Sequence, residues 1–296
     1  MRYLFLLLLA ATLYAQSPPL MLGALEDTHG AFADDQYTRS VRALFIKSGN
    51  DWKPLPTDCL SETCLTQLSK DYPRETTWTI AFDGRKLGDV TSRIPAVIKT
   101  YSNAGQQQIV TALPKGRVPT IGARTKEFAG FIDDPVFRPL VAISQPNFKD
   151  PDLWKPAQLP AAQLKLLRDA FRKKFPNVEN CKTSTSEPAP WAYTDADIEL
   201  QKAYSAKSGW TIAQLHLGKS LCEGPPDGPF NGQWFAIDPA GAIAFLQANM
   251  VLIDAGDYDN SGHSQLLFLI DDYNRGGYVL YYNNFQSSAV FEYTFH

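Results

Sequence analysis

Short runs of alternating apolar and polar residues, each closed by turn-forming residues, recur along most of this 296-residue chain. Residues 76–83 alternate in this way, and the Asp83-Gly84 pair then marks a tight hairpin turn into residues 85–92. The same arrangement recurs over the ranges 40–52, 198–217, 234–246, 266–282 and 289–295. Because alternation separates apolar from polar side chains on the two faces of a strand, the pattern predicts a mostly-β fold.

Two β architectures are consistent with this pattern. The first is an irregular arrangement resembling a β-propeller, and the second is two packed β units. Either would carry a single accessory helix. The chain shows no strong internal repeat, which counts against a regular propeller. Its 21 prolines indicate many turns, and its three methionines and 20% charged residues are unlike a helical bundle.

The accessory helix is expected at about residues 160–175. Pro160 suits a first helical position, and Leu167 and Phe171 recur at a spacing that places them on one helix face. Basic residues at 172–174 complement the helix dipole at its carboxyl end, and Pro176 stops the helix.

A stretch rich in proline and polar residues divides the chain. We expect an N-terminal β-rich region at 16–176, a loop or linker at 177–191, and a C-terminal β region at 192–296. The sequence leaves open whether the two β regions are separate domains or one.

The first fifteen residues resemble a secretory signal peptide. Arg2 supplies a short positive region, residues 3–13 are almost entirely apolar, and Ala15 precedes a cleavage point before Gln16. The alternative is an uncleaved N-terminal anchor, but the apolar run is short for a membrane span. We expect a secreted or periplasmic protein with no transmembrane span after cleavage.

Four cysteines in an exported chain favour two disulfides. Cys59 and Cys64 are close enough in sequence to close one small loop, and Cys181 and Cys222 would then close a long one. The other pairings remain open, as does a zinc site of four cysteines, although the chain has no Cys-x-x-Cys pair.

Charge excludes one class of partner. The formal net charge is −3, so no basic field attracts nucleic acid. The sequence does not identify the partner, and a carbohydrate and another envelope protein are the two candidates.

Residues 254–268 carry the most specific chemical pattern. Oxygen-bearing side chains alternate at Asp257, Asp259 and Ser261, and Gly262 permits the sharp turn that a calcium loop needs. An EF-hand requires a glutamate at the twelfth position, where this chain has Phe268. The apolar run after the loop predicts a buried strand instead of a helix.

Residues 256–268 therefore resemble the calcium loop of the FG-GAP and VCBS repeat families, whose repeats form blades of β-propellers. The resemblance covers thirteen residues and occurs once. It implies a structural calcium ion, of weak affinity because two ligands are neutral (Kd about 0.1–1 mM), with Asp254 as a third anionic group. The alternative is an ordinary turn without an ion. The ligands implied are Asp257, Asp259, Ser261, the backbone oxygen of His263, and Gln265. The rest of the chain resembles exported bacterial proteins in general, which implies no activity.

Catalytic signals are weak. The four histidines form no His-Glu-x-x-His pair, and the chain has no Gly-x-Ser-x-Gly elbow. Acidic residues are adjacent at 26–27, 34–35, 133–134 and 271–272, but neighbours on a strand point to opposite faces and make no glycosidase dyad. We assign no catalytic residue.

Aromatic residues are concentrated near the C-terminus. Such rings stack on sugars in carbohydrate-binding modules, but alternation on a strand places them in a core just as well. The cluster consists of Tyr278, Tyr281, Tyr282, Phe285, Phe291, Tyr293 and Phe295.

The sequence thus favours an exported, non-catalytic binding or structural protein of the cell envelope or extracellular space. The alternative is a secreted hydrolase acting on polysaccharide or cell-wall material. An enzyme would need a cleft that joins distant acidic side chains, whereas a binding protein would need an exposed aromatic or polar patch.

Overall fold

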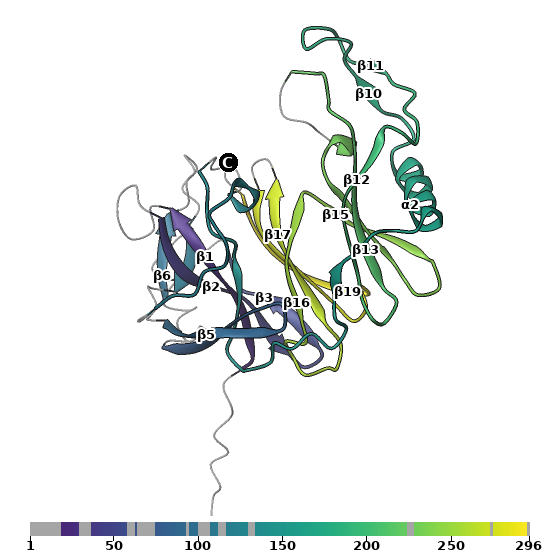
Figure 1. Cartoon of the computed structure of the whole chain (residues 1–296). Coiled ribbons are helices and arrows are strands. Elements are labelled where there is room, and N and C mark those ends of the chain that lie inside the picture. The colour runs from purple at the N-terminus through teal and green to yellow at the C-terminus, as the bar shows by residue number, and fades with distance from the viewer. Residues whose placement is uncertain are drawn as a thin grey trace, which may run out of the picture.

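A computed structural model builds the described part of the chain mainly from antiparallel β-sheets (Figure 1). The predicted signal peptide at 1–15 and the Cys59 and Cys64 pair lie outside the residues that it describes. Those residues are 19–29, 37–57, 63, 75–92, 95–99, 107–111, 117–129, 134–223, 228–272 and 275–294.

The N-terminal sheet has six strands in the order β3-β2-β1-β8-β4-β5. Its core-facing side chains are apolar and almost fully buried, Trp78 and Phe45 among them. The strands are β1 (Met21–His29), β2 (Tyr37–Ser48), β3 (Asp51–Pro54), β4 (Thr76–Phe82), β5 (Arg85–Ser92) and β8 (Leu140–Ile143).

The middle sheet has five strands in the order β15-β14-β13-β12-β9. The chain enters it from β8 through the connection at residues 144–154. Its strands are β9 (Lys155–Pro156), β12 (Ile198–Ser205), β13 (Thr211–Leu217), β14 (Gln233–Ile237) and β15 (Ile243–Ala248).

The C-terminal sheet is a meander of four strands in the order β16-β17-β18-β19. The pairing of β16 with β17 shifts register between Leu252 and Asp254, which marks a bulge. Its strands are β16 (Met250–Gly256), β17 (Gln265–Asp272), β18 (Arg275–Tyr282) and β19 (Ser287–Thr294).

The C-terminal sheet is the central layer. Leu267, Leu269 and Tyr278 on one face pack in the core of the N-terminal sheet. Leu266 and Phe268 on the other face pack with Ile212 and Trp234 of the middle sheet. Burial on both faces explains the unbroken apolar run of β17. The mostly-β prediction is confirmed, and the sheets are packed in layers (Figure 1).

The predicted helix is confirmed as α2 (Ala161–Lys174), with Pro160 as its N-cap residue. Leu167 and Phe171 are fully buried and pack on the outer face of the middle sheet. α2 therefore forms an outermost layer beside β13 (Figure 1). Its basic residues at 172–174 lie in the last turn, where they suit the helix dipole.

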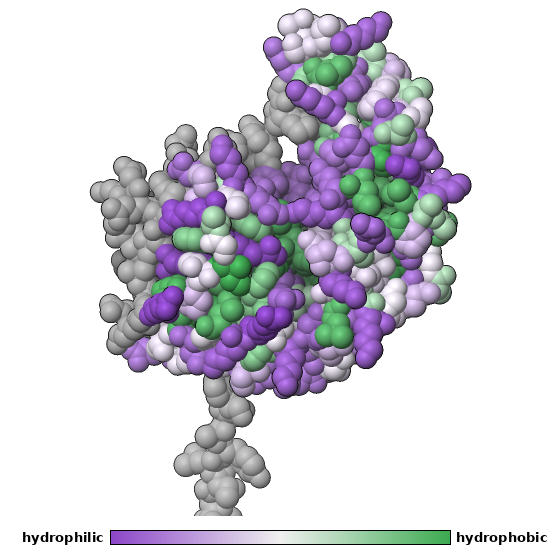
Figure 2. Space-filling view, viewed as in Figure 1, coloured by the Kyte–Doolittle hydropathy of each residue, from purple (hydrophilic) through white to green (hydrophobic). Residues whose placement is uncertain are grey.

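Smaller elements complete the described chain. The predicted linker at 177–191 contains a two-stranded hairpin. Among the described residues, no helix is both long and apolar enough to cross a membrane. On the face shown in Figure 2, hydrophilic residues surround small apolar groups. The smaller elements are β6 (Pro95–Lys99), β7 (Gln107–Thr111), β10 (Glu179–Asn180), β11 (Ala189–Pro190), η1 (Lys126–Phe128) and η2 (Gly228–Phe230).

Candidate functional site

The turn between β16 and β17 holds the predicted calcium ligands. Three of its oxygens surround one nitrogen, the Nε2 atom of Gln265. This nitrogen lies 2.9 Å from Asp259 Oδ1, 3.0 Å from Ser261 Oγ and 2.8 Å from the carbonyl oxygen of His263. The structure therefore gathers all five predicted residues in one turn, where the Gln265 amide lies at the centre of the Asp259, Ser261 and His263 oxygens.

The orientation of this amide is set by a neighbouring backbone group. The N–H of Tyr258 donates to Gln265 Oε1 at 2.6 Å, and Gln265 is only 2% exposed. If the amide were turned over, its NH₂ group would face the Tyr258 N–H, and its oxygen would face the Asp259 carboxylate and the His263 carbonyl. The hydrogen bonds thus assign the nitrogen to the centre of the turn.

Asp257 closes the turn through the backbone. Its two carboxylate oxygens accept hydrogen bonds from the N–H groups of Ser261 and Gly262, each at 2.8 Å. Gly262 has a φ of +84°, a left-handed conformation that glycine adopts without strain. Both oxygens of Asp257 are therefore engaged in shaping the turn, a common role for aspartate.

Asp259 forms an ion pair with Lys47, which lies on β2 of the N-terminal sheet. The Asp259 side chain is 5% exposed and the Lys47 side chain 18%. Burial acts to raise the pKa of Asp259, but the hydrogen bonds of Lys47 and Ser261 outweigh it and hold the pKa below its ordinary value. The Lys47 ammonium also lies 5.2 Å from the ring centroid of Trp52.

The donor set of this turn does not fit a calcium ion as it is arranged. Calcium takes about six to eight oxygen ligands, whereas the centre here receives an amide nitrogen. Asp254 lies on β16 outside the turn and accepts a hydrogen bond from the Asp83 N–H at 3.1 Å. Within the described part of the chain, no three His, Cys, Asp or Glu residues are grouped to hold a metal. Calcium stays a prediction from the sequence.

The turn is tied to the connection between the N-terminal and middle sheets. The N–H of Asp257 donates to the Lys149 carbonyl at 2.8 Å, and the N–H of Ser264 donates to Asp152 Oδ2 at 2.8 Å. The Asp152 N–H in turn donates a hydrogen bond to Ser264 Oγ at 3.3 Å. The β16–β17 turn thus holds this connection against the C-terminal sheet.

The same connection exposes an apolar residue in a strained conformation. Asp150 Oδ1 accepts from the N–H of Leu153 at 3.0 Å, and Oδ2 accepts from the N–H of Trp154 at 2.6 Å. These bonds hold Leu153 at a φ of +54°, which is uncommon for a residue with a branched side chain. Leu153 is 58% exposed, the most of any large apolar side chain in the described chain.

A shallow depression surrounds Leu153 and Trp154. Three exposed cations, Arg85, Lys149 and Lys155, line it. Its two carboxylates are those of Asp83 and Asp150, and Asp150 is already bonded by backbone N–H groups. The depression therefore combines an apolar centre with a cationic rim, and we call it the Trp154 depression.

Aromatic side chains back Trp154 on its other side. The Phe285 ring lies 6.0 Å from Trp154, edge to face, and 5.1 Å from Trp210. With Tyr281 these rings line a small pocket that their own side chains nearly fill. The indole nitrogen of Trp154 is buried without a hydrogen-bond partner in the described structure. The aromatic group thus supports Trp154 from behind.

Most of the C-terminal aromatic cluster fills the core. Tyr278, Tyr281, Tyr282 and Phe291 are each less than a tenth exposed, Phe285 and Tyr293 are half-buried, and Phe295 lies outside the described residues. The described rings of the cluster therefore serve mainly to pack the C-terminal sheet between its neighbours.

The acidic residues Glu26 and Asp27 each form an ion pair with an arginine of β2. Glu26 Oε1 lies 2.6 Å from Arg42 Nε, and Asp27 Oδ1 lies 3.0 Å from Arg39 Nη1. His216, on β13, lies 3.2 Å from the exposed Glu199 carboxylate. These contacts are electrostatic pairings along strands and place no nucleophile beside a base.

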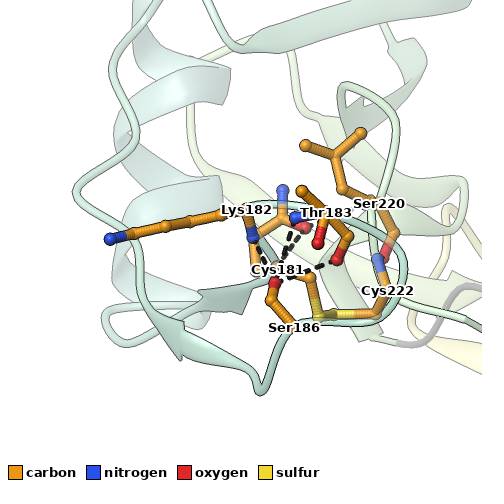
Figure 3. The surroundings of a disulfide bond; sticks show 8 residues. Cys181, Lys182, Thr183, Ser186, Ser220 and Cys222 are labelled. Atoms are coloured by element: carbon orange, nitrogen blue, oxygen red, sulfur yellow. Dashed lines mark hydrogen bonds between the residues drawn. A yellow bond between two sulfur atoms is a disulfide. The ribbon is translucent and has the colours of Figure 1, made fainter.

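One of the two predicted disulfides is confirmed. Cys181 and Cys222 are bonded and join the end of β10 to the segment after β13 (Figure 3). Beside the bond, Asn180 Oδ1 accepts from the N–H groups of Cys181 and Leu221 at 2.8 and 2.9 Å. The disulfide thereby fixes the small β10–β11 hairpin to the middle sheet.

The sequence interpretation missed Lys47, Asp150 and Trp154. The Asp150-Pro151-Asp152 segment is itself a turn signal, and a tryptophan two positions after such a turn was the available clue. Nothing local marks Lys47, because its partner Asp259 is 212 positions away.

Comparison of the chain with models of protein families, with curated proteins and with solved structures found no match in any of the three.

Proposed function

We propose that this chain is an exported, non-catalytic binding protein whose Trp154 depression binds an acidic carbohydrate. Export is supported by the signal-like residues 1–15 and by the Cys181–Cys222 disulfide, a bond that persists in oxidising compartments. Mass spectrometry of the protein isolated from the exported fraction tests this part, because cleavage would leave Gln16 as the first residue.

The single observation that carries the binding proposal is the strained, exposed turn at Leu153. A large apolar residue at positive φ is unfavourable both in backbone strain and in exposed surface, and such strain is concentrated at ligand sites. Asp150 uses its carboxylate to hold this conformation through the N–H groups of residues 152–154. The turn presents Leu153 next to Trp154, an apolar surface suited to the C–H face of a sugar ring.

The cationic rim selects the class of sugar. Arg85, Lys149 and Lys155 outnumber the carboxylates of Asp83 and Asp150 around the depression. A uronic acid or sulfated sugar would place its anionic groups against these cations, and arginine suits carboxylates by its planar fork of donors. A neutral sugar would leave the rim unused.

Calorimetry of the purified chain with oligogalacturonate, a chain of uronic acids, tests the proposal. We expect binding that weakens as salt is added, because exposed charges are screened. Trp154→Ala and Lys149→Ser/Lys155→Ser should each weaken binding by about tenfold or more. Leu153→Asn should also weaken it while keeping the fold, because asparagine tolerates positive φ.

Matched controls separate the site from the surface at large. Leu166→Ala and Lys165→Ser alter an exposed apolar residue and an exposed cation on α2, and neither should change affinity. Neutral oligoglucose should bind at least tenfold more weakly. Binding of polyglutamate as tight as that of the uronic acid would overturn the carbohydrate proposal in favour of a protein partner. Release of new sugar ends from the polymer would favour the hydrolase alternative.

A further inference from the structure

The centre of the β16–β17 turn is the place where a calcium loop would hold its ion. The oxygens of Asp259, Ser261 and His263 converge there on Gln265 Nε2 at 2.8–3.0 Å. We propose that this turn is a metal-independent clasp, in which the Gln265 amide replaces the cation as a hydrogen-bond donor and Lys47 replaces its charge. The inference is independent of the carbohydrate proposal.

The hydrogen-bond balance of Gln265 supports this assignment. An amide NH₂ carries two donors and its oxygen is an acceptor, so the group has a good partner on each side here. Nε2 faces three acceptors, and Oε1 faces the N–H of Tyr258 at 2.6 Å. For Gln265 to ligate calcium through Oε1, this oxygen would have to leave the Tyr258 N–H, which would then be buried without that partner.

The charge balance points the same way. The turn carries two carboxylates, Asp257 and Asp259, and Lys47 neutralises Asp259. The two oxygens of Asp257 are satisfied by the N–H groups of Ser261 and Gly262. An arriving divalent cation would meet one unneutralised carboxylate and the Lys47 ammonium close by, and calcium affinity falls as ligand charge falls.

The clasp joins three separate parts of the chain. Lys47 comes from β2, the turn itself follows β16, and the connection at 149–152 is bound through Asp257 and Ser264. Because the amide and the ammonium are built into the chain, this junction stays closed whether or not divalent cations are present. A calcium-dependent turn would open the same junction when calcium is removed.

Thermal unfolding tests the clasp in calcium and in chelator. For the wild-type chain we expect the same Tm in about 5 mM calcium as in chelator, because the closed clasp offers calcium no site in the folded state. Gln265→Glu places a carboxylate where the amide donates, so its Tm in chelator should fall, and calcium should raise that Tm by several degrees. Gln286→Glu adds the same charge in the exposed β18–β19 turn and should not respond to calcium.

A second variant covers the case in which Gln265→Glu fails to fold. Gln265→Met keeps the length of the side chain and removes both donors and the acceptor, so its Tm should fall by the same amount in calcium and in chelator. A wild-type Tm that rises with calcium concentration, and loses this response in Asp259→Asn, would overturn the clasp and restore the calcium site. A Gln265→Met variant as stable as the wild type would also overturn it.

Discussion

The Asp254 carboxylate on β16 accepts a hydrogen bond from the backbone N–H of Asp83, in the β4–β5 turn, at 3.1 Å. This bond joins the C-terminal sheet to the N-terminal sheet. The second oxygen of Asp254 is buried and unpartnered in the described structure. Burial raises the pKa of Asp254 to about 7, although the N–H groups of Asp83 and Ala255 and the charge of Arg138 act to lower it.

A raised carboxyl pKa makes the folded state bind a proton that the unfolded chain releases. The unfolded pKa is about 3.9, so Asp254 should lower the free energy of unfolding as pH rises from about 4 to about 7. Asp254→Asn keeps an acceptor for Asp83 and cannot ionise. The free energy of unfolding of Asp254→Asn, relative to that of wild type, should therefore increase by roughly 2–4 kcal/mol between pH 5 and pH 8, as measured by urea unfolding.

Asp197→Asn is the matched control for this pH dependence. Asp197 is half-buried, and hydrogen bonds from the Thr194 backbone and hydroxyl lower its pKa. Its contribution to stability is present above the unfolded pKa and is lost only as pH falls through the folded pKa, so Asp197→Asn should show no pH-dependent difference from wild type between pH 5 and pH 8. A difference between Asp254→Asn and wild type that stays flat from pH 5 to pH 8 would contradict the assignment.

The Lys47–Asp259 pair should contribute measurably to stability because both side chains are largely buried. Lys47→Met leaves the Asp259 carboxylate without its counterion, and we expect the free energy of unfolding to fall by about 1–3 kcal/mol. Asp259→Asn in the same chain should recover part of this loss, and urea unfolding of the two single variants and the double variant gives the coupling energy.

The exposed pair Lys165–Asp169 on α2, 2.8 Å apart, provides the comparison. Exposed ion pairs four residues apart in a helix contribute only about 0.3–0.5 kcal/mol. If the Lys47–Asp259 coupling were no larger than this, the ion pair would not be a structural part of the clasp.

The Cys181–Cys222 bond should stabilise the chain by limiting its unfolded states. The bonded residues are 41 positions apart, for which the chain-entropy account gives about 4 kcal/mol. We expect Cys181→Ser/Cys222→Ser to lose about 2–4 kcal/mol in urea unfolding. Reductant should lower the free energy of unfolding of the wild type to the value of this variant or below it. Equal stability of variant and wild type would show that this disulfide does not stabilise the folded chain.

Phe171 should be the residue that holds α2 to the middle sheet. It is fully buried, and its ring lies 5.0 Å from Phe175 and 6.4 Å from Phe235. Phe171→Ala should cost about 3–5 kcal/mol through lost contacts and the cavity that remains. Leu166→Ala, on the exposed side of the same helix, should stay within about 0.5 kcal/mol of wild type. Similar losses in the two variants would contradict this packing.

Local elements were predictable because their causes are local. The hairpin at β4 and β5 follows from alternation and from the Asp83-Gly84 turn, whose residues have φ angles of +51° and +65°. The helix follows from apolar spacing between Pro160 and Pro176. The unbroken apolar run of β17 predicted a buried strand, but it carried no information on which sheets would cover it.

The candidate sites divide in the same way. The convergence of oxygens from Asp259, Ser261 and His263 could be predicted from the sequence alone, because a glycine-containing turn of this length brings alternate positions together. The groups that these oxygens face depend on the packing of distant segments. Lys47 reaches Asp259 from β2, and the buried Gln265 amide donates to the oxygens of the turn. Spacing along a chain specifies local geometry, whereas charge and hydrogen-bond balance depend on groups brought together from distant segments.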